Sequence, residues 1–137
     1  MVFEPHIPEP KYASISSRAA ALACHRLGLP PVELRFFRES DAEPVKNGRQ
    51  RGQPWQDSPY LKGICSQRLL SGETDVWIRS GLSEKQLCIT VAHELYHFYE
   101  NTKYLPTDED KAEQFGHEIW QEMTAPRNEW VNHLYFQ

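Results

Sequence analysis

The sequence of 137 residues has few cysteines, no long apolar run and no excess of positive charge. Cys24, Cys65 and Cys88 form no C-x-x-C pair, so we expect reduced thiols in the core rather than a disulfide framework or a cysteine zinc site. No apolar run approaches the roughly 20 residues that span a bilayer, so no membrane role is expected. Residues 1–10 carry no basic patch before an apolar stretch, so we expect no secretory signal and a cytoplasmic protein.

Length and charge limit the organisation of the chain further. A net charge of −4 argues against general binding to nucleic acids, and the length suits a single domain with its own core. The frequent prolines near the start predict an extended arm over residues 1–13. One domain is expected over residues 14–126, followed by a tail over 127–137. That tail ends in H-L-Y-F-Q, which resembles the remnant of a tag-cleavage site, and we assign it no function.

The hydrophobic pattern predicts an α+β fold with an N-terminal helix, a small three-stranded sheet and two final helices. Gly28 is the expected end of the first helix, and Ser83 is the expected N-cap of the second. The predicted segments are a helix over 15–27, strands over 32–38, 60–67 and 74–80, a long loop over 39–59, a turn over 69–72, a helix beginning after Ser83 and a last helix over 108–124.

The motif H-E-x-x-H occupies residues 93–97, inside the predicted second helix. Residues four apart lie on one face of a helix, so His93 and His97 can reach the same ion. Zinc accepts nitrogen ligands in a tetrahedron and keeps one position open for water where the site is catalytic. Glu94 points about 100° away from His93, which suits a general base acting on that water better than a third ligand. The motif therefore predicts a catalytic zinc site.

A third protein ligand has to come from another part of the chain. The residues at positions 100 and 103 are Glu100 and Lys103, which excludes the longer motif with a third histidine. Glu109, Glu113 and His117 follow at spacings of four along one side of the last helix. A short connection predicts an antiparallel helix pair, in which the first turn of the last helix lies near His97. This arrangement favours Glu109 as the third ligand and leaves Glu113 and His117 as alternative ligands.

Two segments resemble a known family. The stretch D-V-W-I-R-S-G-L-S-E-K-Q-L-C-I-T-V-A-H-E-L-Y-H, followed by E-D-K-A-E-Q-F-G, is similar to the ImmA/IrrE-type zinc metallopeptidases. These belong to the gluzincins and have a minimal thermolysin-like core. Their second motif, E-x-x-A-x-x-F-A, is matched by Glu109, Ala112 and Phe115, with Gly116 in place of the final alanine. The resemblance covers residues 74–120.

The resemblance implies a zincin-like fold, with Zn²⁺ held by His93, His97 and Glu109 and with Glu94 as the base. We expect hydrolysis of a peptide bond in a specific, regulatory protein substrate, for which a transcriptional regulator is one candidate. The substrate is expected to pair with an exposed strand, and the strand over 74–80 is our choice because it leads to the site helix. Tyr96, Tyr99 and His117 are candidate donors to the oxyanion, although aromatic residues mainly supply packing area.

Three alternatives use the same residues. The chain could be a catalytically silent zinc-binding protein that regulates or binds a partner, an interaction module that uses the edge of its sheet, or a zinc hydrolase that acts on a non-peptide amide. Glu94 favours hydrolysis, because a structural zinc site closed by four protein ligands needs no base.

Overall fold

The structure, a computed structural model, describes residues 7–38, 62–67 and 74–125. The predicted loop over 39–59, the turn over 69–72 and the tail over 127–137 lie outside the described residues. The elements are α1 (Pro10–Leu27), β1 (Leu34–Phe37), β2 (Gly63–Gln67), β3 (Thr74–Arg79), α3 (Glu84–Thr102) and α4 (Glu109–Thr124). The predicted α+β class and the order of elements are confirmed.

Helix α1 begins earlier than the sequence pattern predicted. It starts at Pro10, so the prediction of an extended arm up to residue 13 is wrong over 10–13. Proline suits the first turn of a helix, because its fixed φ is already helical and its missing N–H has no partner there in any helix. The helix ends as predicted at Gly28, whose φ of 67° is the left-handed conformation that glycine adopts without strain.

The three strands form one sheet in the order β1-β3-β2. Strand β1 runs parallel to β3, and β2 runs antiparallel to it. The predicted pairing of a substrate with strand 74–80 is therefore wrong, because β3 is the central strand and both of its edges already carry a neighbour. Hydrophobic alternation shows which face of a strand is buried but not which strand lies at the edge. The alternation itself is confirmed, since Val76 and Ile78 are both fully buried.

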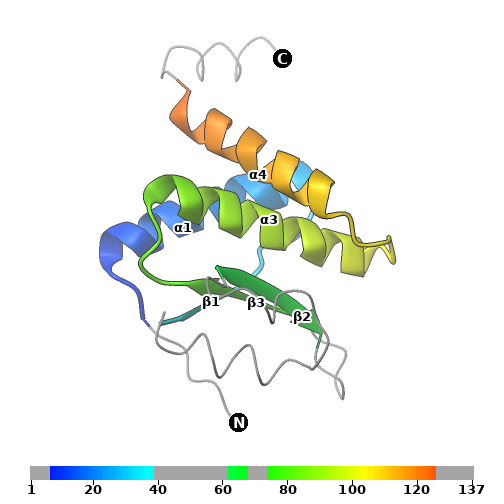
Figure 1. Ribbon diagram of the computed structural model, residues 1–137, viewed down its shortest axis with the longest axis horizontal. Coiled ribbons are helices and arrows are strands. Elements are labelled where there is room, and N and C mark those ends of the chain that lie inside the picture. The colour runs from blue at the N-terminus through cyan, green and yellow to red at the C-terminus, as the bar shows by residue number, and fades with distance from the viewer. Residues whose placement is uncertain (1–6, 39–61, 68–73, 126–137) are drawn as a thin grey trace.

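The helices lie on one face of the sheet (Figure 1). Helix α3 contacts β2 and β3 on one side and α1 and α4 on others. The side chain of Ser83 accepts a hydrogen bond from the backbone N–H of Gln86, and Asp108 caps α4 in the same way through Lys111. In Figure 1, α3 and α4 run in opposite directions. Helix α3 leads away from its connection to β3, and α4 returns across α3. The predicted antiparallel pair is confirmed.

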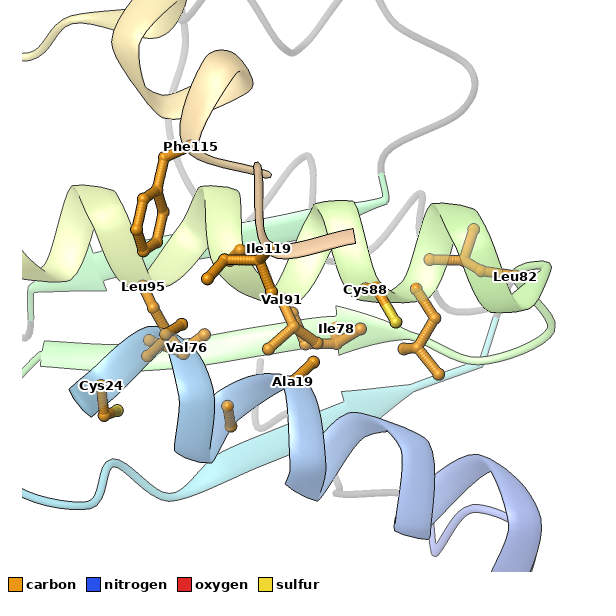
Figure 2. Close-up of a cluster of buried hydrophobic side chains, with 14 residues drawn as sticks. Ala19, Cys24, Val76, Ile78, Leu82, Cys88, Val91, Leu95, Phe115 and Ile119 are labelled. Carbon is orange, nitrogen blue, oxygen red and sulfur yellow. The ribbon is translucent and has the colours of Figure 1, made fainter. Parts of the chain in front are cut away.

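The core fills the space between these helices and the sheet. Figure 2 shows Val91 and Leu95 of α3 between the strand residues Val76 and Ile78 and residues of α4 and α1. Such close packing holds α3 on several sides, which makes it a rigid support for side chains on its remaining face. Among the described helices, none combines the length and apolarity that crossing a membrane requires.

Candidate metal centre

Two imidazoles of α3 face the start of α4. His93 and His97 lie one turn apart, and their ring centroids are 4.8 Å apart. Their Nε2 atoms approach to 3.1 Å. Both side chains are largely shielded, with exposures of 19% for His93 and 12% for His97. The helical spacing therefore brings one nitrogen of each ring to a common point.

Glu109, the first residue of α4, completes a group of three. Its Oε2 lies 3.0 Å from Nε2 of His93, and its Oε1 lies 2.9 Å from Nε2 of His97. The three residues predicted as metal ligands are thus brought together, and this group could hold a metal ion. The N-cap at Asp108 fixes where α4 begins and so where Glu109 stands.

The outer nitrogens of both rings face carboxylates. Nδ1 of His93 lies 3.0 Å from Oε2 of Glu113, and Nδ1 of His97 lies 2.6 Å from Oε1 of Glu100. A carboxylate accepts a hydrogen bond from a ring N–H, and in each ring both nitrogens face a carboxylate. Metal binding requires the tautomer in which the outer carboxylates hold the hydrogens on Nδ1 and both Nε2 lone pairs point to the ion. In that tautomer two lone pairs and the carboxylate of Glu109 converge at about 3 Å. A cation at their centre would offset the repulsion between them.

The spacing of these three groups suits zinc. Bonds of 2.0–2.1 Å in a tetrahedron place ligand atoms roughly 3.3–3.4 Å apart. The two Nε2 atoms are 3.1 Å apart, and they lie 3.0 and 2.9 Å from different oxygens of Glu109, so a metal requires a few tenths of an ångström of expansion and one Glu109 oxygen turned toward both rings. The Glu109 side chain is 69% exposed and can supply its own part of that movement. The donor set of two imidazoles and one carboxylate is also one that zinc accepts in catalytic sites, with the fourth position left open.

A glycine allows the two helices to approach closely. A β-carbon at Gly116 of α4 would lie 2.8 Å from the backbone oxygen of Ile89 and 2.9 Å from its Cγ2. Such distances are shorter than real β-carbon contacts, so this position of α4 has no room for even a methyl group. The glycine at position 116 is therefore explained by the local packing of α4 on α3.

Glu94 is buried between α3 and the sheet. It is 8% exposed, and its side chain lies against β2 at Gly63, where a β-carbon would come within 2.9 Å of its Cγ. A further contact of that β-carbon would be Cγ2 of Thr90, at 2.8 Å. The predicted base thus neighbours the strand that forms one edge of the sheet. The absence of a side chain at Gly63 is what leaves space for it.

The structure assigns different surroundings to the three further candidates. Glu113 contacts His93 through the nitrogen turned away from the ligand group, so it supports a ligand. Nε2 of His117 lies 3.2 Å from the other oxygen of Glu113, so the Glu113 carboxylate lies between His117 and His93. The ring of Tyr96 packs on Phe115, with centroids 5.6 Å apart. Burial, with a smaller contribution from the charge of Glu100, raises the pKa of the Tyr96 hydroxyl, which therefore keeps its proton.

Two residues at this centre were missed in the sequence analysis. Glu100 appeared there only as a position that excludes a longer motif, yet it is 2% exposed and bonds to His97. Its position three residues after His97, within an apolar helix, was an available signal. Gly63 gave no signal, because its importance depends on the approach of α3 to the sheet.

Comparisons of the chain with protein-family models, with curated proteins and with solved structures returned no match.

Proposed function

We propose that this chain is a zinc-dependent peptidase whose metal is held by His93, His97 and Glu109. The observation that supports it most is the convergence of two imidazole nitrogens and a carboxylate from two helices, with the outer nitrogen of each ring against a further carboxylate. The resemblance to the ImmA/IrrE-type peptidases agrees with this ligand set. Glutamates around the centre add negative charge that favours a cation.

Glu94 supplies the proton chemistry in this proposal. Zinc held by His93, His97 and Glu109 would supply polarisation of the scissile carbonyl and a water whose pKa is lowered to about 7. Glu94 accepts the proton of the attacking water and delivers it to the leaving amine, so the same carboxylate acts first as base and then as acid. Burial beside β2 keeps its side chain in one place, which such a role requires.

The substrate pairs with β2 in this proposal rather than with β3. Among the described strands, β2 has β3 on one side and no partner on the other. A peptide can add to such an edge through its backbone groups. Gly63 of β2 lies against Glu94, so a peptide on this edge runs past the proposed base. Strand β1 forms the other edge of the sheet. The site helix α3 packs on β2 and β3, so β2 is the edge strand that the site helix covers.

Metal content tests the ligand set. We expect close to one zinc per chain in the purified protein by elemental analysis, and loss of zinc in His97→Ala and Glu109→Ala. Glu118→Gln is the matched control, because Glu118 lies on the same helix and contacts Gln114 instead of the histidines. A wild-type protein that binds no zinc, or variants that bind it as tightly, would contradict the proposal.

Glu94→Gln separates hydrolysis from silent metal binding. The zinc-loaded wild type is incubated with a peptide library, and the cleavage products are read by mass spectrometry. We expect the variant to bind zinc normally and to lose cleavage, because the amide cannot accept a proton. Cleavage that survives in the variant excludes Glu94 as the base. Zinc binding with no cleavage by the wild type would favour the catalytically silent regulatory protein.

A further inference from the structure

Glu100 is the most buried carboxylate beside the metal centre, and the proposed reaction does not use it. It lies in the last turns of α3, three residues after His97, and is 2% exposed. A buried carboxylate is costly unless its oxygens find donors. Both oxygens of Glu100 have one, and the two donors belong to different parts of the centre.

One oxygen binds a ligand and the other binds the start of α4. Oε1 lies 2.6 Å from Nδ1 of His97. Oε2 accepts a hydrogen bond of 2.7 Å from the backbone N–H of Asp108. Asp108 is the N-cap of α4 and immediately precedes Glu109. One side chain therefore connects the second histidine of the group to the residue next to its carboxylate.

We propose that Glu100 is a positioning residue that sets the tautomer of His97 and fixes Glu109 relative to it, and so determines the affinity of the centre for zinc. This inference rests on the proposed function. The carboxylate holds the imidazole hydrogen at Nδ1, which leaves the Nε2 lone pair directed at Glu109, 2.9 Å away. Without it, the hydrogen can move to Nε2 and block the metal.

The backbone of the same residue also shapes the connection to α4. The carbonyl oxygen of Glu100 accepts a hydrogen bond of 2.9 Å from the N–H of Leu105. Tyr104, which precedes Leu105, has a φ of 56°, an uncommon conformation for a residue with a side chain. Glu100 therefore accepts hydrogen bonds from Leu105 and from Asp108. These two contacts stabilise a backbone conformation that Tyr104 does not favour by itself.

Glu100→Gln tests the proposal with almost no change of shape. Two donors, from His97 and Asp108, face the side chain, whereas an amide offers one accepting oxygen and one donating NH₂. One donor must then face another donor, and a shift of the His97 hydrogen to Nε2 relieves that conflict. We expect the affinity for zinc to fall roughly 10- to 100-fold, the usual effect of losing a partner of a metal-bound histidine.

The tautomer gives a readout that a purely structural role would not change. Two-dimensional ¹H–¹⁵N spectra of the imidazoles, recorded without metal at a pH where the rings are neutral, identify which nitrogen carries the hydrogen. We expect Nδ1–H at His97 in the wild type and Nε2–H in Glu100→Gln. Glu118→Gln, the same change on an exposed part of α4, is expected to match the wild type in both measurements.

The outcomes separate this inference from the proposed function. A wild type that binds no zinc overturns the proposed function and the inference with it. Equal zinc affinity and an unchanged His97 tautomer in Glu100→Gln overturn the inference alone. If the variant does not fold, the wild-type spectrum decides, because an Nε2–H tautomer at His97 contradicts the role given to Glu100.

Discussion

Helix propensity predicts that Gly116→Ala stabilises the protein. The close contact of α4 with α3 at this position predicts that it destabilises the protein instead. Alanine in place of glycine inside a helix stabilises it by about 0.5–1 kcal/mol. At Gly116, however, the added β-carbon would lie 2.8 Å from the backbone oxygen of Ile89. Since ordinary contacts begin at 3.4 Å, the helices have to separate by about 0.6 Å. Backbone atoms cannot turn aside as the end of a side chain can.

We therefore expect Gly116→Ala to destabilise the protein. Overpacking of a tight contact costs about 1–3 kcal/mol, which exceeds the gain in propensity and leaves a net loss of about 1 kcal/mol. The displacement also moves Glu109, about 10 Å away along the same helix, relative to the two histidines. We expect the affinity for zinc to fall roughly tenfold, at the low end of indirect changes to metal ligands.

Urea unfolding and zinc titration measure the two effects. Gln114→Ala is the control for a change of side chain on an exposed part of α4, and it should leave the affinity for zinc unchanged. A Gly116→Ala protein that is more stable than the wild type and binds zinc equally would refute the reasoning. That result would mean that propensity governs this position and that the approach of α3 and α4 does not set the geometry of the centre.

Three other predictions follow from named contacts. Gly63→Ala crowds Glu94 at 2.9 Å, so we expect zinc affinity to stay the same while peptide cleavage slows by up to about 100-fold; unchanged cleavage contradicts the proposed place of the base. Zinc at 100 times its Kd should raise the free energy of unfolding by about 2.7 kcal/mol, measured in urea, and a chelator should reverse the gain; identical unfolding curves with and without zinc argue against a site formed only in the folded chain. Burial raises the pKa of Tyr12 to about 12 from 10.0, and its hydroxyl donates to the carbonyl oxygen of Arg79. The stability that the neutral Tyr12 hydroxyl contributes is complete below pH 10 and is lost as the pH rises from 10 to 12. Tyr12→Phe should therefore lose less stability than the wild type between pH 9 and 11.5. An equal loss in both proteins would exclude a contribution of the buried hydroxyl.

The parts of the centre that lie on one helix, or at its ends, could be predicted from the sequence. The spacing of His93 and His97 determines that they share a face, and Ser83 marks the start of their helix, because both depend on local geometry. Glu109 needed one further step, the antiparallel packing of consecutive helices joined by a short connection. That step succeeded because few arrangements are open to two adjacent helices.

The order of the strands could not be predicted in this way. The strand over 74–80 precedes the site helix in the chain, and closeness in sequence suggested that it borders the site. In the structure, β2 and β1 lie on either side of β3. Patterns of alternating hydrophobicity are the same for a central and an edge strand when one face is buried, so they carry no information on which strand has a free edge.

Glu100 shows why the partners of ligands are harder to predict than the ligands themselves. A charged residue in the last turns of a helix normally belongs to the solvated surface, and its spacing from His97 suits a contact without requiring one. What buries Glu100 is the return of the chain at Asp108, whose N–H takes up the second oxygen. The same return places Glu109 beside His97. The burial of Glu100 and the assembly of the centre are therefore consequences of one turn, and a change that opens this turn should loosen both together.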